Sequence, residues 1–238
     1  MKIRIIGPGR AGRSFHAAFG AVGLESELLD RSAAVGAAGD GVDVVLIATP
    51  DRAIAEVAQA IEPTDAAVLH CSGATGIAVL AHHRRHGSVH PLMALPDAET
   101  GAARLADGGW FAVAGDPVAA DLVAALGGRS FEVADNDRVL YHATAAISAN
   151  HVVALLGQVE RLAEQVGVPT EAFLAMTRDC LGDVEAKGAA AALTGPAARG
   201  DVTTLDAHRA ALPPAELDLY NALVAAAERL ATLRSQGP

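Results

Sequence analysis

The sequence predicts an α/β fold in which a doubly wound parallel sheet is followed by an all-helical domain. Through the first half of the 238-residue chain, short apolar runs alternate with helical patterns, which is typical of parallel strands joined by helices. From about Asn136 the strand pattern stops and long helical patterns follow. We therefore expect two domains, residues 1–135 and residues 136–238, which meet at the polar segment 135–137.

The apolar run at residues 42–48 is nearly continuous, as expected for a strand that is covered on both faces. The strands expected in the first domain are residues 3–6, 27–30, 42–48, 66–70, 87–90 and 110–114. The helices expected between them are residues 10–22, 52–61, 76–86 and 117–126. Long helices are expected in the second domain at residues 137–166, 170–193 and 214–233.

Charge and composition exclude several classes of partner. With 18 basic and 28 acidic residues the formal net charge is −10, so the chain lacks the positive surface that nucleic-acid binding requires. No run approaches the ~20 apolar residues of a membrane helix, and the first residues lack the apolar stretch of a signal peptide. Two widely separated cysteines suit a reducing compartment. We expect a cytoplasmic protein that binds a small molecule and neither nucleic acid nor a membrane.

The first expected strand runs into a glycine-rich turn at residues 7–12, Gly-Pro-Gly-Arg-Ala-Gly, which opens the first helix. This is the G-x-G-x-x-G pattern of dinucleotide-binding domains, and each glycine has a mechanical role. Gly7 makes the tight turn, Gly9 lets a pyrophosphate approach the backbone, and Gly12 lets the helix pack on the strand. The pattern predicts a Rossmann domain that binds NADP or NAD.

The donors to the pyrophosphate are expected at the start of the first helix. Pro8 has no N–H group, so the backbone N–H groups that follow it, at Arg10 and Ala11, must supply the hydrogen bonds. The positive end of the helix dipole favours an anion at the same place. The guanidinium of Arg10 is also within reach of the phosphates.

The end of the second expected strand carries the residues that select between the two cofactors. Asp30 lies close to the ~20-residue spacing expected for the acid that binds the ribose. Its carboxylate suits the 2′-hydroxyl of NAD, whereas the neighbouring Arg31 suits the 2′-phosphate of NADP. The sequence leaves both cofactors open, and Arg31 favours NADP slightly.

Two further loops are expected at the same crevice, because ligands of doubly wound folds bind beyond the carboxyl ends of the strands. The first follows the third expected strand and holds Thr49, Pro50 and Asp51. The second follows the fourth strand and holds Ser72 and Gly73. All five residues are candidates for binding the cofactor.

Eight segments together resemble a known family, the bacterial Rossmann-like proteins whose C-terminal helical domain is of unknown function and which are related to 6-phosphogluconate dehydrogenase. The segments in the first domain are Gly-Pro-Gly-Arg-Ala-Gly (7–12), Ala-Thr-Pro-Asp (48–51), His-Cys-Ser-Gly-Ala (70–74) and Ser-Val-His-Pro-Leu (88–92). Those in the second domain are Tyr-His-Ala-Thr-Ala-Ala (141–146), Ser-Ala-Asn (148–150), Leu-Thr-Gly-Pro (193–196) and Arg-Gly-Asp (199–201).

The layout is more distantly similar to that of pyrroline-5-carboxylate reductase, ketopantoate reductase, prephenate dehydrogenase and the F420-dependent NADP reductases. This resemblance implies a nicotinamide held between the crevice and the helical domain, and a homodimer formed through the helices. It also implies an NAD(P)-dependent reductase or dehydrogenase that acts on a small oxo acid or imine, with ketopantoate reduction as one specific case. The alternative is a non-catalytic nucleotide-binding or regulatory protein whose helical domain is an interaction surface.

Hydride transfer needs a group that polarises the acceptor or moves a proton, and three residues are candidates. His90 ends the fifth expected strand, and its His-Pro pair resembles that of prephenate dehydrogenases. Asn150 falls on an apolar helix face, where an amide should need a partner. Related dehydrogenases carry a lysine one turn before such an asparagine, but no lysine precedes Asn150. His142 is the polar residue upstream, and its eight-residue separation corresponds to about 12 Å along a helix.

No metal site is expected. His82 and His86 have the i, i+4 spacing of a helical metal-binding pair, but no third ligand accompanies them. We interpret residues 82–86 as a solvated helix end. Arg199, Asp201 and His208 follow the second long helix and suit either the cleft or a dimer interface.

Overall fold

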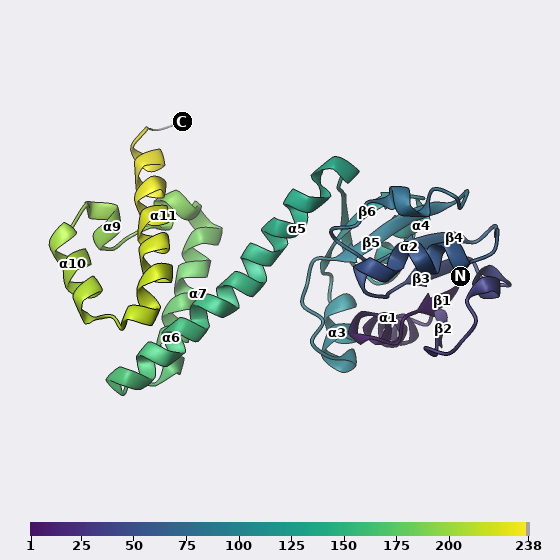
Figure 1. Cartoon of the computed structure of the whole chain (residues 1–238), viewed down its shortest axis with the longest axis horizontal. Coiled ribbons are helices and arrows are strands. Elements are labelled where there is room, and N and C mark those ends of the chain that lie inside the picture. Colours follow the sequence, from purple (N-terminus) through teal and green to yellow (C-terminus); the bar gives the residue numbers. More distant parts are fainter. Residues whose placement is uncertain (237–238) are drawn as a thin grey trace. The chain divides into compact units, whose positions relative to one another are not determined.

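The computed structural model describes residues 1–236 and divides into two compact units, one from Met1 to His151 and one from Val152 onward. Figure 1 shows the first as a sheet with helices on both faces and the second as helices only. The α/β class with a following helical domain is therefore confirmed. The first unit extends past the expected boundary at residue 135, because the helix that starts at Arg138 packs on the sheet.

The sheet has the strand order β2-β1-β3-β4-β5-β6-β7, and its pairs are parallel except for β5 with β6. The chain runs outward from β1 to β2 and returns to β3 on the other side of β1, so the topological switch lies between β1 and β3. The strands are β1 (Lys2–Ile6), β2 (Glu25–Leu29), β3 (Val44–Ile47), β4 (Ala67–His70), β5 (His86–Pro91), β6 (Trp110–Gly115) and β7 (Arg129–Glu132).

Both faces of the central strands are covered. Alternate side chains of β3 enter different cores: Val44 and Leu46 pack with Phe15, whereas Val45 and Ile47 pack with Ile54. This alternation is the two-residue period of a strand, and it explains why the run is apolar throughout. The covering helices are α1 (Arg10–Ala21), α2 (Asp51–Ala60), α3 (Ala98–Leu105) and α4 (Val118–Ala125).

Two glycines of the turn between β1 and α1 are required by space. Gly7 has a φ of +114°, and a Cβ there would lie 2.7 Å from the carbonyl carbon of Ala48. A Cβ on Gly12 would lie 2.0 Å from the carbonyl oxygen of Gly7. The first strand and first helix can approach this closely only without these side chains.

Several elements differ from the expected ones. The expected helix at 76–86 is wrong, because only the short helix η2 (Ile77–Leu80) forms before β5 begins at His86. The rings of His82 and His83 instead contact the carbonyl oxygen of Ala58 in α2. Helix α3 and strand β7 were not expected from the sequence. The residues of β7, Arg-Ser-Phe-Glu, are exposed except for the half-buried Phe131, so they lack the apolar pattern of a buried strand.

The expected helix 137–166 is one continuous helical run that changes type in the middle. It consists of α5 (Arg138–Ala146), the π-helical turn η4 (Ile147–His151) and α6 (Val152–Val166). The run 135–166 is long and apolar enough to cross a membrane. Its most apolar stretch has a mean hydropathy of 1.4, and no residue of that stretch is buried. Length and hydropathy alone do not identify a membrane helix, so the absence of a membrane partner stays a prediction.

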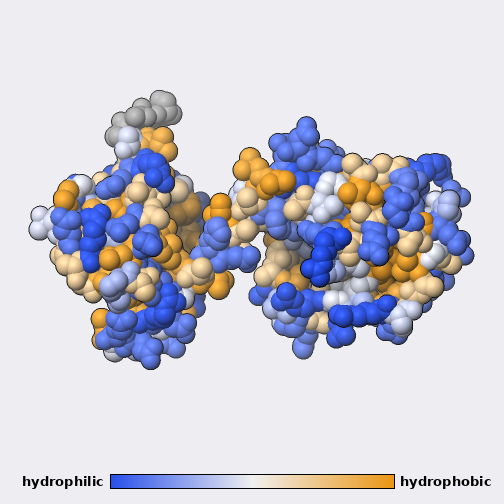
Figure 2. All heavy atoms as spheres, viewed as in Figure 1, coloured by the Kyte–Doolittle hydropathy of each residue, from blue (hydrophilic) through white to orange (hydrophobic). Residues whose placement is uncertain are grey.

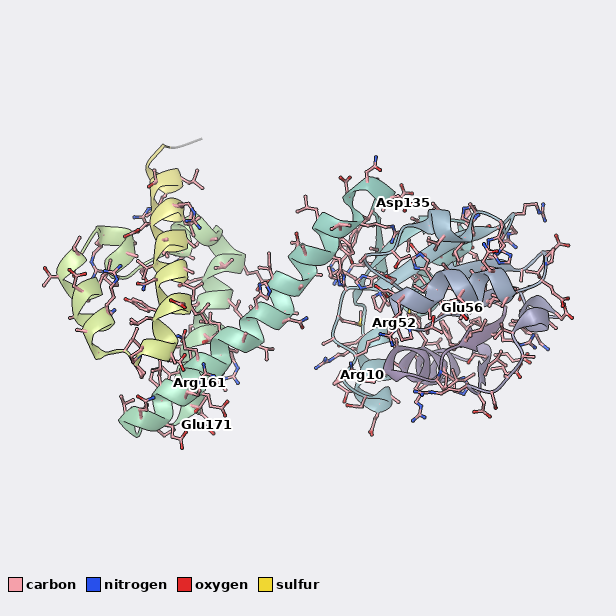
Figure 3. All side chains as sticks on the ribbon, in the orientation of Figure 1. Arg10, Arg52, Glu56, Asp135, Arg161 and Glu171 are labelled. Atoms are coloured by element: carbon pink, nitrogen blue, oxygen red, sulfur yellow. The ribbon has the colours of Figure 1, made fainter. Side chains whose placement is uncertain are left out.

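The second unit contains only helices within residues 152–236. Arg161 on α6, labelled in Figure 3, forms two hydrogen bonds of 2.7 and 2.9 Å with Glu216, which fixes α6 to the start of the last helix. Figure 2 shows hydrophobic side chains on parts of this unit's surface. Its helices after α6 are α7 (Thr170–Lys187), α8 (Ala189–Ala192), α9 (Pro196–Arg199), α10 (Val202–Ala211), η5 (Pro214–Glu216) and α11 (Leu217–Gln236).

Candidate functional site

A cavity of about 610 Å³ lies at the carboxyl ends of β1 and β3, where the sheet topology switches. We call it the crevice cavity. Six of the expected cofactor-binding residues line it, namely Gly7, Gly9, Asp30, Arg31, Thr49 and Pro50. Arg52, the second residue of α2, was not expected from the sequence and lines it as well. The strand ends therefore bring the glycine turn and two of the predicted loops together.

The crevice cavity has the features expected for a phosphate-binding turn. No atom lies within 4 Å of the position of a Cβ on Gly9, so the backbone there is open to a ligand. Figure 3 shows Arg10 and Arg52 at the starts of α1 and α2, on the same edge of the sheet. The buried hydroxyl of Thr49 has no hydrogen-bond partner among the described residues. An anionic, polar ligand would satisfy these groups.

Four of the expected cofactor-binding residues, Arg10, Ala11, Gly12 and Asp51, do not line the cavity. Arg10, Ala11 and Gly12 form the first turn of α1, where Gly12 is buried against Gly7. Asp51 is the first residue of α2. The cofactor-binding roles assigned to all of these residues stay predictions.

Ser72 and Gly73 lie in the loop after β4, but neither lines the crevice cavity. The hydroxyl of Ser72 accepts hydrogen bonds from the backbone N–H groups of Ala74 and Thr75, so its main visible role is to shape the loop. A Cβ on Gly73 would lie 2.8 Å from both the His90 ring and Nδ1 of His142. The loop after β4 therefore lies beside the two candidate histidines.

His90, His142 and Asn150 line one cavity of about 210 Å³, which we call the histidine cavity. His142 on α5 and Asn150 on η4 both line this cavity, although their separation of about 12 Å along a helix is too large for both to touch one small carbonyl group. Asn150 is exposed rather than buried. The other lining residues are Pro91, Leu92, Met93, Ala94, Ala145, Ala146, Ser148 and Ala149.

His90 contacts Tyr141, a residue that was not among the catalytic candidates expected from the sequence. Its Nδ1 atom lies 2.7 Å from the hydroxyl oxygen of Tyr141 on α5. The pKa of His90 is lowered to about 4, mainly by burial and also by the neighbouring His142 and Arg138. Burial also raises the pKa of Tyr141 to about 12. Both partners are therefore uncharged at neutral pH.

Arg138, at the start of α5, is the other residue that sequence reasoning missed. Its side chain is 1% exposed, and it donates to Oδ1 of Asp135 at 2.8 Å and to the hydroxyl of Ser88 on β5. Asp135, labelled in Figure 3, also accepts from the backbone N–H of Ile77 at 3.1 Å. The i, i+3 spacing of Asp135 and Arg138 was the signal that could have identified the pair.

The residues at the end of β4, His70 and Cys71, have shifted pKa values. His70 is fully buried, and its Nδ1 accepts the backbone N–H of Ser72 at 3.2 Å. Burial lowers the pKa of His70 to about 4, and Arg138 contributes to that shift. Burial raises the pKa of the Cys71 thiol to about 12, whereas Cys180 on α7 is exposed.

The remaining candidates from the sequence lie in the second unit. Asp201 caps α10 by accepting from the backbone N–H of Thr204. His208 contacts the hydroxyl of Tyr220 at 2.9 Å, and both line a mainly apolar cavity of about 760 Å³. Within the described part of the chain, no group of three or more His, Cys, Asp or Glu residues is arranged to hold a metal ion.

The sequence from β6 to α11 matches a protein family. Residues 111–227 match the model described as "Domain of unknown function (DUF2520)". These residues form a DUF2520 domain. The resemblance to a Rossmann-like family with a helical domain of unknown function is thereby confirmed. No curated protein matches the sequence closely enough to count as a relative.

Solved structures are similar to this chain over nearly its whole length. Protein TM1727 from Thermotoga maritima has 21% identity and a TM-score of 0.73, over 98% of this chain and 99% of its own. A reductive aminase from Aspergillus terreus, in complex with NADPH and ethyl levulinate, has 14% identity and a TM-score of 0.69, over 100% and 99%. Pyrroline carboxylate reductase from Plasmodium falciparum, with NADP bound, has 11% identity and a TM-score of 0.66, over 97% and 98%. At these identities the likeness establishes the fold.

The buried His70 predicts a loss of stability in weak acid. Its pKa is lowered from 6.5 to about 4 by folding, so between these values the unfolded chain binds more protons than the folded chain. The free energy of unfolding is then unaffected above about pH 6.5 and falls as the pH drops toward 4, by up to about 3 kcal/mol for His70. Urea unfolding between pH 5 and pH 7.5 measures this dependence.

The substitution His70→Asn is the matching variant, because its side-chain oxygen can still accept the N–H of Ser72. It should reduce the slope of stability against pH in this range, whatever it costs at pH 7.5. An undiminished slope in the variant would contradict the assignment to His70.

Proposed function

We propose that this protein is an NADP(H)-dependent oxidoreductase that reduces a small oxo acid or imine, or oxidises the corresponding product. The observation that carries the proposal is that one compact unit holds both a glycine-rich crevice at the topological switch and the histidine cavity. The reductive aminase with NADPH and the pyrroline carboxylate reductase with NADP support it, since they share the fold.

The residues of the crevice fit a dinucleotide. The N–H groups at the start of α1 and the guanidinium of Arg10 would bind the pyrophosphate, beside the open backbone of Gly9. The unpartnered hydroxyl of Thr49 supplies a hydrogen-bonding group at the same cavity. The bound cofactor supplies or accepts a hydride.

The histidine cavity provides the groups that act on the substrate. His90 is the residue that we expect to polarise the carbonyl or imine and to exchange a proton with it. His142 and Asn150 line the same cavity and would orient the substrate through ring and amide hydrogen bonds. Glycine at position 73 leaves room for the two rings, because a Cβ there would lie 2.8 Å from both of them.

The preference for NADP rests on two arginines. Arg31 and Arg52 both line the crevice cavity with Asp30, so two cations and one carboxylate surround the expected position of the ribose. A 2′-phosphate would gain charge-assisted hydrogen bonds from both guanidinium groups. Asp30 alone favours the 2′-hydroxyl of NAD.

The substitution Arg31→Ala should weaken NADPH binding by about tenfold, the effect of one charge-assisted hydrogen bond, and should leave NADH binding nearly unchanged. Fluorescence titration with each cofactor gives the two dissociation constants. Arg84→Ala is the matched control, because Arg84 is exposed, pairs with Asp65 and lies outside the crevice cavity. Equal losses for NADPH and NADH would contradict a contact with the 2′-phosphate.

The decisive experiment for the function is a titration with NADPH and NADH followed by a screen of oxo acids and imines for cofactor oxidation. We expect micromolar binding and oxidation of NADPH with at least one substrate class. Tight binding without turnover would favour the alternative, a nucleotide-binding regulatory protein, which the lack of a lysine before Asn150 supports. Failure to bind either nucleotide would overturn both.

We also propose that the protein is a cytoplasmic homodimer formed through the helical domain. Large apolar side chains on the helical run 135–166 are exposed, among them Val139 at 72%, Leu140 at 71% and Val153 at 69%. Exposed apolar surface of this kind marks an interface in a soluble protein. Both cysteines are free, which suits a reducing compartment.

Sedimentation velocity at micromolar concentration should give twice the chain mass of 24.1 kDa. The double substitution Val139→Asp and Val153→Asp places charges on this surface and should shift the protein toward monomer. A wild-type protein that sediments as a monomer would contradict the proposal.

A further inference from the structure

We propose that Tyr141 is a positioning residue for His90: its hydroxyl donates to Nδ1 and holds the imidazole as the neutral tautomer with a proton on Nε2, so that His90 acts as an uncharged hydrogen-bond donor. This inference rests on the proposed function for its catalytic meaning. The tautomer itself follows from the contacts around the ring.

The direction of the hydrogen bond decides the tautomer. Nδ1 of His90 and the hydroxyl oxygen of Tyr141 are 2.7 Å apart. A phenol is a stronger donor than a neutral imidazole N–H, and an unprotonated imidazole nitrogen is a stronger acceptor than a phenol oxygen. The favoured arrangement therefore places the shared proton on the tyrosine. Since a neutral imidazole carries one proton, that proton must be on Nε2.

Nε2 faces the side of the ring where the loop after β4 and α5 meet. A Cβ on Gly73 would lie 2.8 Å from Nε2 of His90 and 2.8 Å from Nδ1 of His142. The two nitrogens thus flank the space that any larger residue at position 73 would fill. Because His90 and His142 also line the histidine cavity, an Nε2–H donor suits a carbonyl oxygen or imine nitrogen bound there.

The ring of Tyr141 packs against aromatic side chains of the sheet. The ring of Phe131 on β7 stands edge to face with Tyr141 at a centroid distance of 5.9 Å, and Trp110 on β6 packs on Phe131 at 6.1 Å. The guanidinium of Arg129 lies over Trp110 at 4.4 Å. Tyr141 is therefore held in place by the sheet and is a rigid partner for His90.

The register between α5 and β5 brings the pair together. Ser88 and His90 lie two residues apart on one face of β5, and they contact Arg138 and Tyr141, which lie three residues apart on one face of α5. The steps are about 6.6 Å along a strand and about 4.5 Å along a helix, similar enough for both contacts to form at once.

The charge environment keeps the ring neutral. The groups that act on His90 are His142, Tyr141 and Arg138 on α5, His70 on β4 and Asp51 on α2. Together with burial they lower the pKa of His90 to about 4, since the single carboxylate of Asp51 is outweighed. An imidazolium is thus disfavoured at neutral pH, and the ring can donate only through the nitrogen that Tyr141 leaves protonated.

Long-range ¹H–¹⁵N correlation spectra of histidine-labelled protein test the tautomer without any substrate. The signals of His90 are assigned by their loss in His90→Gln. We expect a protonated Nε2 and an unprotonated Nδ1 in the wild type at pH 7, and a mixture of tautomers in Tyr141→Phe. Tyr220→Phe is the matched control, because it removes the hydroxyl from the separate His208–Tyr220 pair and should leave the His90 signals unchanged.

Kinetics test the positioning role once a substrate is known. Tyr141→Phe should lower kcat by about tenfold with little change in KM, because fewer molecules hold the correct tautomer. His90→Gln keeps an N–H donor near Nε2, so adding Tyr141→Phe in that background should change kcat by less than about twofold. Additive losses would assign Tyr141 a merely structural role.

The two proposals fail separately. A protonated Nδ1 in the wild type, or an unchanged tautomer in Tyr141→Phe, would overturn the positioning role even in an active enzyme. A protein with the expected tautomer that oxidises no cofactor with any substrate would instead contradict the proposed function.

Discussion

The buried guanidinium of Arg138 is the contact on which the arrangement of the site depends. It joins the start of α5 to β5 through Ser88 and to the loop at Ile77 through Asp135, with only 1% of its side chain exposed. Breaking a buried, hydrogen-bonded charge pair is costly, so α5 has one strongly preferred register on the sheet. That register sets Tyr141 against His90 and brings His142 into the same cavity.

The unit that contains the sheet therefore holds both candidate cavities, the crevice cavity and the histidine cavity. Gly73, in the loop after β4 of the same unit, lies beside both histidines. The DUF2520 match begins at residue 111, within β6, and so covers the strands and helix that hold Tyr141. The family model thus includes Phe131, which packs on Tyr141, but not Trp110.

The sheet and its crevice could be predicted because they depend on local patterns. Apolar runs of four to six residues and the glycines at 7–12 report directly on buried strands and a tight turn. The contacts of Arg138 and Tyr141 could not be predicted, since they join residues about 50 positions apart in the chain. The edge strand β7 was missed because its packing role falls on one residue, Phe131, among polar neighbours.

The two cysteines differ in a way that makes the native chain convenient for spectroscopy. Thiol reagents attack the thiolate, and burial keeps the sulfur of Cys71 protonated far above neutral pH. Cys180 is exposed on α7, in the helical unit. An alkylating fluorophore added at neutral pH should therefore attach preferentially at Cys180, and it will report on the helices rather than on the unit that contains the sheet.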